Sequence, residues 1–278
     1  MGKFGMATGQ NKLFTVVALT LTTTLKSCNP ETLPCNLTND MEHNGIWSES
    51  FRINAFMVDK NREAGFTTIA NLFQEVANNH AFNRQLDFYN MRERGLFWVL
   101  GRLRLTLLRR PLWQETVFAN TWVSRMAPFA HRHLEMLDAA GLPLAYAYSI
   151  WSPLDAITRK PRRLPDVEVP LSDKTTPLRA PDKIVMAENG AVSFEKKVTY
   201  SDLDMLGHVN NVKYIEWMLD DLYQQTEKIP YNTLEINYID EVFQGQTVQL
   251  HTTKTTEAAF FLLRCAESGQ EVCRARWA

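Results

Sequence analysis

Two stretches of the chain repeat hydrophobic side chains at the spacing of an amphipathic helix. In the first, GFTTIANLFQEVANNHA, one stripe contains Phe66, Ile69, Ala70, Phe73, Val76, Ala77 and His80. In the second, VNNVKYIEWMLDDLY, the stripe contains Val212, Ile215, Leu219 and Leu222. Recurrence every three or four residues places such side chains on one helix face. The pattern therefore predicts two long helices, each facing a core.

Strand-like runs follow each helix. After the first, Leu103, Leu105 and Leu107 alternate with polar residues, and the runs ETVFANTWV, HRHLEMLD and LPLAYAYSIW come next. After the second come LEINYIDEV, QTVQLHTTK, AAFFLLRCAE and QEVCRARWA, with turn signals between the runs. The chain thus repeats the order strand, long helix, four antiparallel strands. This order predicts an α+β fold of two tandem repeats, each a long helix wrapped by a curved antiparallel sheet.

A proline-rich segment lies between the two repeats. Residues 151–183 hold six of the twelve prolines of the chain. Such a density is incompatible with central strands and favours an extended connection. We therefore predict an N-terminal domain over residues 46–154, a linker over 155–190 and a C-terminal domain over 191–278.

The first 45 residues do not fit this plan. Two lysines, Lys3 and Lys12, precede the run LFTVVALTLTTTL, which is too short and too rich in threonine to span a bilayer. A secretory signal ending at Cys28 is one interpretation, but Lys26 fits the residues before a cleavage site poorly. We expect instead a poorly ordered extension, or a start codon assigned too early with Met41 as the working start.

The composition is typical of a globular protein. Of 278 residues, 45% are hydrophobic and 22% are charged. The formal net charge is −1, so the chain has no excess of positive charge that would favour binding to nucleic acid. The cysteines Cys28, Cys35, Cys265 and Cys273 match no zinc or redox spacing. Cys265 and Cys273 are expected to face opposite sides of a hairpin, which disfavours a disulfide. We expect a cytoplasmic protein; plastid-like or secretory targeting by the N-terminal segment is the alternative.

The stretch SDLDMLGHVNNVKYIEW places titratable groups just before the second helix. The plainer interpretation assigns Asp202 and Asp204 to the helix N-terminus and Asn210 to its cap. His208, however, adds an imidazole that titrates near neutral pH, and Gly207 allows the backbone to approach a bound group. An acid–base pair beside the N–H groups of a helix start can activate water and hold an oxyanion. The stretch therefore favours hydrolysis of an ester or thioester.

The same residues carry a resemblance to a known family. SDLDMLGHVNNVKYIEWMLD is similar to the second-half motif of the plant-type fatty acyl-ACP thioesterases. TTIANLFQEVANNHA and LFWVLGRLRLTLLRRPLWQETVFANTWV resemble the first-half helix and strands of that family. The similarity runs from about Ile46 to the C-terminus. It implies a double hot dog fold that cleaves the thioester between a fatty acid and acyl carrier protein (ACP), ending fatty acid synthesis.

The resemblance also implies the catalytic residues. The family's aspartate falls on Asp204, its histidine on His208, and its downstream glutamate on Glu241, in the strand after the motif helix. Val242 stands where many plant members have a cysteine, which favours direct attack by water over a thiol nucleophile. In that hypothesis Glu241 and His208 orient or deprotonate the water, and Asp204 holds the substrate or its partners.

The remaining positions of the site are expectations of the same scheme. The N–H groups of Val209, Asn210 and Asn211 are expected to face the oxyanion. Leu206 replaces an asparagine of the plant members, so the role of that amide is absent or falls to Asn210. The first repeat has GFTT in place of GHVN, so we expect it to supply the acyl pocket, with lining candidates Phe66, Phe73 and Trp98.

No cofactor or metal is expected, because phosphopantetheine chemistry needs none. His131, His133 and Glu135 share one strand face, but this is an incomplete ligand set, and we interpret that face as a polar outer surface. His80 is interpreted as a core histidine with a buried hydrogen-bond partner.

The expected partner is ACP carrying a phosphopantetheine-linked acyl chain. Basic residues near residues 102–110 and 159–163 are either ordinary surface or a docking site for this acidic protein. Neither nucleic acid nor a membrane span is expected, and both a monomer and a homodimer fit the pattern. Two alternatives stay open: an acyl-CoA thioesterase in which Glu241 is a bystander, and a catalytically inactive module that binds acyl chains or a carrier, which Leu206 would favour.

Overall fold

The computed structural model describes residues 41–278 apart from 165–168, 187–189, 225 and 227–228. The expectations for residues 1–40, including the possible signal and the cysteines Cys28 and Cys35, lie outside the described residues. The assignment of residues 41–45 to an extension is wrong, because β1 (Met41–His43) pairs with β2 (Ile46–Arg52). Asn44 and Gly45 make this turn with positive φ angles of 52° and 73°. The folded unit therefore includes Met41.

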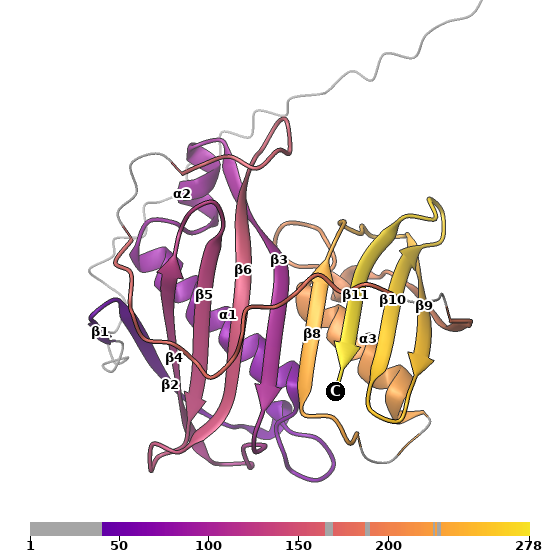
Figure 1. Cartoon of the computed structure of the whole chain (residues 1–278), viewed down its shortest axis with the longest axis horizontal. Coiled ribbons are helices and arrows are strands. Elements are labelled where there is room, and N and C mark those ends of the chain that lie inside the picture. The colour runs from indigo at the N-terminus through magenta and orange to yellow at the C-terminus, as the bar shows by residue number, and fades with distance from the viewer. Residues whose placement is uncertain (1–40, 165–168, 187–189, 225, 227–228) are drawn as a thin grey trace, which may run out of the picture. The chain divides into compact units, whose positions relative to one another are not determined.

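One antiparallel sheet of eleven strands runs through the described residues, which form one compact unit (Figure 1). Its first half has the order β1, β2, β4 (Thr116–Arg125), β5 (Ala130–Leu137), β6 (Pro143–Asp155) and β3 (Leu96–Leu107). Its second half has the order β8 (Thr233–Tyr238), β11 (Glu271–Trp277), β10 (Ala259–Cys265), β9 (Thr247–Lys254) and β7 (Val192–Lys197). From β2 and β7 inward, the two halves have the same strand order. The predicted tandem repeat is confirmed.

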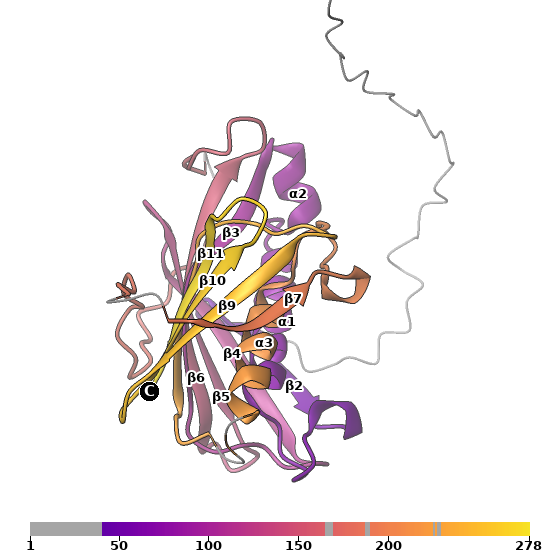
Figure 2. The same ribbon diagram turned by 90° about the vertical axis from the view of Figure 1, so that its right-hand side faces the viewer.

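The two predicted helices lie on one face of this sheet (Figures 1 and 2). The helix α1 (Phe66–Asn83) buries the whole predicted stripe, and α3 (Asn211–Tyr223) buries Val212, Ile215 and Leu222 with Leu219 packed beside them. Short elements accompany them: the 3-10 turns η2 (Ala55–Met57) and η3 (Tyr200–Asp202), and the unpredicted helix α2 (Phe88–Glu93). Asp87 starts α2 by accepting a hydrogen bond from the Tyr89 N–H at 2.9 Å.

The two repeats share a single core. Strands β3 and β8 pair with each other, which places Leu103 opposite Ile236 and Leu105 opposite Leu234. Phe66 of α1 packs edge-on against Trp277 of β11, with ring centroids 5.1 Å apart. The division into two domains and a linker stays a prediction, because the described residues form one compact unit.

The proline-rich segment begins inside β6, which contains Pro153, and its described part after Asp155 has no helix or strand. Residues 169–186, called the strap below, cross the outer face of the sheet (Figure 1). The Ser172 N–H donates to the Val123 carbonyl at 3.0 Å, and the Trp122 indole donates to the Lys174 carbonyl at 2.6 Å. At its far end the Ile184 N–H donates to Asn237 Oδ1 at 2.8 Å. The strap therefore contacts strands of both repeats.

The strap changes the character of the face that the sequence indicated to be solvated. His131, His133 and Glu135 are all buried, and Glu135 pairs with Lys174 of the strap. His133 Nδ1 lies 3.1 Å from Thr176 Oγ1. The interpretation as an exposed polar surface is wrong, because a polar layer is enclosed between sheet and strap. Within the residues the structure describes, no group of three or more His, Cys, Asp or Glu side chains could hold a metal ion.

The two described cysteines are free thiols, and both lie in the core. The expectation that they face opposite sides is wrong. A β-bulge shifts the register between β10 and β11 after Leu263, which faces Cys273, so that Arg264 is opposite Glu271. The extra residue in β11 reverses the alternation that simple pairing predicts.

Burial of His133 predicts acid sensitivity. Desolvation, with a smaller effect of nearby His131, lowers the pKa of His133 from 6.5 to about 4. The unfolded chain therefore binds this proton first as the pH falls, so stability that is present above pH 6.5 is lost toward pH 4. We expect the titration of His133 to lower the free energy of unfolding by about 2 kcal/mol at pH 5 relative to pH 7.5. Urea unfolding at both pH values will measure this loss.

The variant His133→Gln keeps hydrogen-bonding capacity and removes the titration. Its free energy of unfolding should fall less than that of the wild type between pH 7.5 and pH 5. Equal losses in the two proteins would show that His133 does not set the acid sensitivity.

Candidate active site

The motif loop between η3 and α3 is held by its own carboxylates. Asp202 accepts from the Thr199 N–H at 2.7 Å in a capping box and pairs with Lys196 at 3.4 Å. Asp204 Oδ1 accepts from the Leu206 N–H at 2.8 Å, while its own N–H donates to the His208 carbonyl at 2.8 Å. Asp202 and Asp204 therefore stabilise the loop before α3 rather than the first turn of α3.

His208 faces the loop that follows β8. Its Nδ1 lies 3.5 Å from Glu241 Oε1, and its ring packs edge-on against Phe243 at 5.1 Å. The second carboxylate oxygen of Glu241 pairs with Arg159, which lies just after β6 and whose guanidinium lies over the Phe97 ring. The expectation that Glu241 lies in the strand after the motif helix is wrong, because β8 ends at Tyr238 and Glu241 is in the loop that follows. The loop position lets it reach the histidine.

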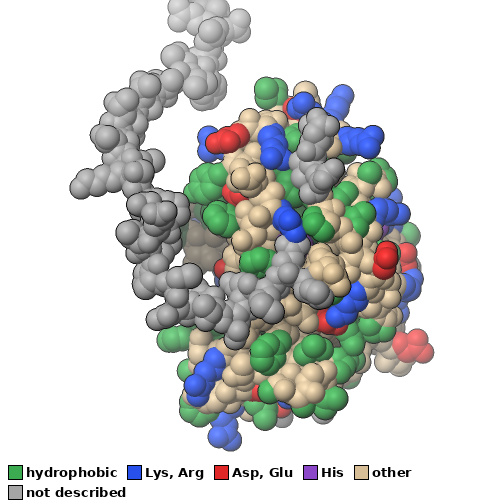
Figure 3. Space-filling model, turned by 90° about the vertical axis from the view of Figure 1, so that its left-hand side faces the viewer, with side chains coloured by type: hydrophobic (Ala, Val, Ile, Leu, Met, Phe, Trp, Pro, Cys, Tyr) green, Lys and Arg blue, Asp and Glu red, His purple; other side chains and the backbone are tan. Residues whose placement is uncertain are grey.

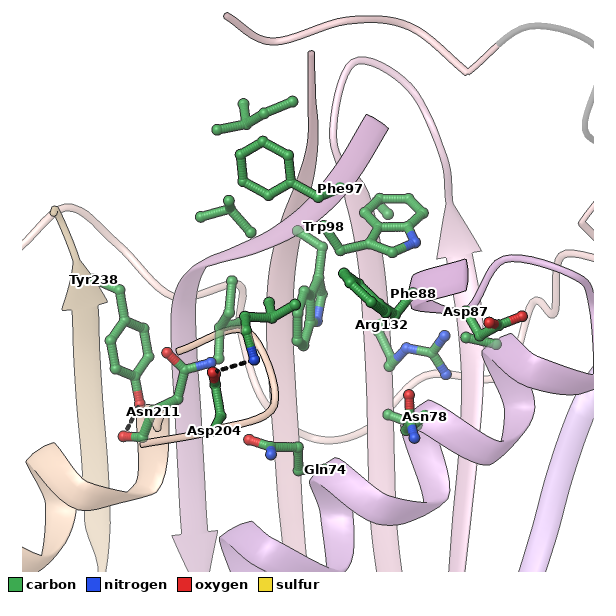
Figure 4. Close-up of a pocket in the computed structure, with 18 of the residues that line it drawn as sticks. Gln74, Asn78, Asp87, Phe88, Phe97, Trp98, Arg132, Asp204, Asn211 and Tyr238 are labelled. Atoms are coloured by element: carbon green, nitrogen blue, oxygen red, sulfur yellow. Dashed lines mark hydrogen bonds between the residues drawn. The ribbon is translucent and has the colours of Figure 1, made fainter. Parts of the chain in front are cut away.

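The three predicted catalytic residues, Asp204, His208 and Glu241, line one cavity of about 690 Å³. The walls of the cavity come from α1, α2, β3 and β5 of the first repeat and from the motif loop of the second (Figure 4). The candidate catalytic groups of one repeat therefore open onto a chamber built largely by the other.

Two of the predicted oxyanion donors are already used. The Val209 N–H donates to the Val242 carbonyl at 2.9 Å, and the Asn210 N–H donates to the Asp202 carbonyl at 2.9 Å. The expectation that they face an oxyanion is wrong in this arrangement. Asn211, the first residue of α3, also lines the cavity, and its N–H has no hydrogen-bond acceptor among the described residues. Asn211 is thus the remaining backbone donor of the three.

Asn210 serves as the N-cap of α3. Its Oδ1 accepts from the Val212 N–H at 2.9 Å. Its side-chain oxygen is therefore engaged, which leaves only the NH2 group of Asn210 for the role of the asparagine that Leu206 replaces. Val242 is fully buried, and neither of the two cysteines described lines the cavity.

The three residues predicted to line the acyl pocket lie in three different places. Trp98 lines the cavity and donates from its indole to the Leu86 carbonyl at 2.9 Å. Phe73 lines a smaller adjoining cavity of about 40 Å³. Phe66 lines neither, because its ring packs against Trp277 in the core, so its assignment to the pocket is wrong.

Sequence reasoning missed the polar residues of the cavity wall. Gln74, Asn78, His80 and Arg132 all line it. His80 is buried as expected, stacks on Trp47, and its Nδ1 lies 3.1 Å from Arg132 Nη1. Burial, reinforced by the charge of Arg132, lowers the pKa of His80 to about 3. The helix stripe contains His80, but Arg132 lies on the inward face of β5, where alternation alone did not mark it as functional.

Two family models cover most of the chain. Residues 45–169 match the N-terminal domain of acyl-ACP thioesterases, and residues 187–278 match the C-terminal domain. The chain belongs to the acyl-ACP thioesterase family. The helix-and-sheet repeats described above are accordingly a double hot dog fold.

Relatives and solved structures agree with this membership. The chain is 29% identical to a chloroplastic palmitoyl-ACP thioesterase of Cuphea hookeriana over 67% of its own length and 49% of that protein. It is 27% identical to an oleoyl-ACP thioesterase of Arabidopsis thaliana over 85% of its own length and 77% of that protein. It thus spans about half the length of the first of these curated relatives.

Among solved structures, an acyl-ACP thioesterase of Bacteroides thetaiotaomicron superposes with a TM-score of 0.76 at 28% identity, covering 84% of this chain and 97% of that one. The 12:0-ACP thioesterase of Umbellularia californica shares the fold, with a TM-score of 0.76 at 22% identity, covering 85% of this chain and 98% of that one. None of the described helices is long and apolar enough to cross a membrane.

The capping role of Asn210 gives a direct test. We expect Asn210→Ala to lower the free energy of unfolding by about 1 kcal/mol, and Asn210→Asp, which preserves the cap, to change it by only a few tenths of that. Urea titration will measure both. A stable Asn210→Asp protein with greatly reduced catalytic activity would show instead that the amide group takes part in the reaction.

Proposed function

We propose that this protein hydrolyses fatty acyl-ACP, releasing the free fatty acid and ACP. The observation that carries the proposal is the meeting of Asp204, His208 and Glu241 at a cavity of about 690 Å³ in a chain of the acyl-ACP thioesterase family. The names of the relatives support the same substrate, because those proteins are acyl-ACP hydrolases. A large cavity beside acid–base groups is the usual form of a small-ligand enzyme site.

The geometry supports a division of labour between His208 and Glu241. Glu241 is held on one oxygen by Arg159 and lies 3.5 Å from His208 Nδ1 on the other, so it can fix the orientation and tautomer of the imidazole. Nε2 of His208 is then the acceptor for a water proton. Such catalytic hydrogen bonds commonly shorten when substrate binds.

The reaction follows in two steps. Water attacks the thioester carbonyl carbon as its proton passes to His208 Nε2, and the new C–O bond leaves a negative charge on the carbonyl oxygen. The Asn211 N–H at the start of α3 is positioned to stabilise that charge. The C–S bond then breaks, and the proton on His208 passes to the departing pantetheine thiolate. Asp204 contributes by holding the motif loop through the Leu206 N–H.

The surface beside the cavity suits an acidic carrier protein. Lys160 and Arg163 are exposed next to Arg159 at the cavity wall, and neither has an acidic partner among the described residues. Arg104, Arg109 and Arg110, by contrast, pair with carboxylates. In Figure 3, Lys and Arg side chains are scattered over the face shown, several of them at its upper end. Basic groups at the entrance would steer ACP and align its prosthetic arm.

A cytoplasmic location also belongs to the proposal. Buried free thiols at Cys265 and Cys273 are compatible with a reducing compartment.

Hydrolysis of a panel of acyl-ACPs and the matching acyl-CoAs tests the function. We expect kcat/KM on acyl-ACP to fall by about 100-fold or more in His208→Asn and Glu241→Gln, because each removes part of the proton-transfer pair. Asp204→Ala should also lower it by releasing the motif loop. Circular dichroism and Tm will confirm that each variant is folded.

The possible results separate the alternatives. Preference for acyl-CoA with an active Glu241→Gln would indicate an acyl-CoA thioesterase. If the folded wild type hydrolyses no thioester, the protein would instead be a catalytically inactive binding module.

Reversal of charge at the entrance tests the docking site. The double variant Lys160→Glu/Arg163→Glu should raise KM for acyl-ACP by about tenfold and leave kcat unchanged, because the charges act on encounter. Lys183→Glu is the matched control, an exposed lysine on the strap. If the KM of the double variant is unchanged at low salt, ACP docks at a different surface.

A further inference from the structure

The wall of the cavity holds a cation that the proposed reaction does not use. Arg132 lies on β5 with its side chain on the α1 side, opposite to the neighbouring His131 and His133. Its Nη1 contacts Thr121 Oγ1 at 3.0 Å and His80 Nδ1 at 3.1 Å. Both contacts are with neutral groups.

No carboxylate of the described residues balances this charge. Five acidic residues line the same cavity: Glu75, Asp87, Asp204, Asp240 and Glu241. Among the described residues none of them, and no other acid, forms an ion pair with Arg132. Asp87 is the cap of α2, where it accepts from the Tyr89 N–H and from Asn90. Burial lowers the pKa of Arg132 to about 10, so the group stays charged at neutral pH.

A guanidinium has five N–H donors, and most of those of Arg132 are unused. Only Nη1 contacts protein acceptors; Nε and Nη2 have none among the described residues. A buried charge is costly unless it is paired and hydrogen-bonded. The planar fork of an arginine matches the two oxygens of a carboxylate. The cavity therefore offers an unfilled site for an electronegative group.

This site lies away from the reacting groups. In Figure 4, Asp204, Asn211 and Tyr238 are at one side of the cavity, Arg132, Asn78 and Asp87 are at the other, and Gln74 lies between them. An acyl chain that enters past His208 would extend toward Arg132. A plain alkyl chain would bring only C–H groups to these polar side chains, whereas alkyl ligands are best matched by apolar walls.

We propose that the cavity takes acyl chains that carry an oxygen function at their far end, with a terminal carboxylate bound best and a hydroxyl next, and that Arg132 binds this oxygen. The inference rests on the proposed function for the thioester end of the substrate. It makes Arg132 a specificity-determining residue without a part in the proton transfer.

The test compares matched substrates of equal chain length: dodecanoyl-ACP, 12-hydroxydodecanoyl-ACP and the ACP monothioester of dodecanedioic acid. For the wild type we expect kcat/KM to be at least about tenfold higher for the diacid thioester than for dodecanoyl-ACP, because a charged hydrogen bond is gained. Arg132→Met, which keeps the length of the side chain, should lose this preference. Arg125→Met on β4 is the matched control, an exposed arginine outside the cavity.

Calorimetric binding of free dodecanedioate and dodecanoate makes the test independent of hydrolysis. Tighter binding of the diacid that depends on Arg132 would support the inference even if no thioester is cleaved, in which case the proposed function alone fails. Equal or weaker reaction and binding of the oxygenated ligands in the wild type would overturn it and leave Arg132 as a cavity wall held by His80 and Thr121. The wild-type comparison decides the matter if Arg132→Met does not fold.

Discussion

The antiparallel pairing of β3 with β8 is the interaction on which the rest of the structure depends. Each repeat ends its sheet at this strand, and the pairing of Leu105 with Leu234 and its neighbours joins two sheets into one. Both long helices then lie on the same face of that sheet. As a result the motif loop of the second repeat stands beside the chamber of the first. Without this seam, Asp204 and Trp98 would not line the same cavity.

The outer face depends on a second constraint, which is that buried polar groups need partners. His133, Glu135 and Asn237 lie on strands, yet each bonds to the strap instead of water. The strap has prolines and no regular structure, so its Asp182 carbonyl and Ile184 N–H are free to bond to Asn237, while its Thr176 and Lys174 side chains meet His133 and Glu135. A connection that looks like a spacer in the sequence thus forms a layer of the fold.

Periodicity alone located both long helices and the strands after them, because each helix and strand buries one face. The motif loop was also recognisable, since a histidine and two carboxylates ahead of an apolar stripe are local features. Glu241 could be named only through family resemblance, because a loop glutamate carries no local signal. The engagement of the Val209 N–H was out of reach, since its acceptor Val242 lies far along the chain. Arg132 could not be singled out either, because its lack of a counter-ion becomes visible only after α1, α2 and β5 are packed.

The placement of the wall and the reacting groups on different repeats has a consequence for how this molecule could diversify. A substitution on β5 or α1 alters what fits the chamber, while the histidine and glutamate proposed to handle the proton stay on a separate part of the chain. Selectivity and turnover are then under largely independent control, as in an assembly of two unlike subunits. Here the two parts are one polypeptide, so their stoichiometry and alignment are fixed at synthesis.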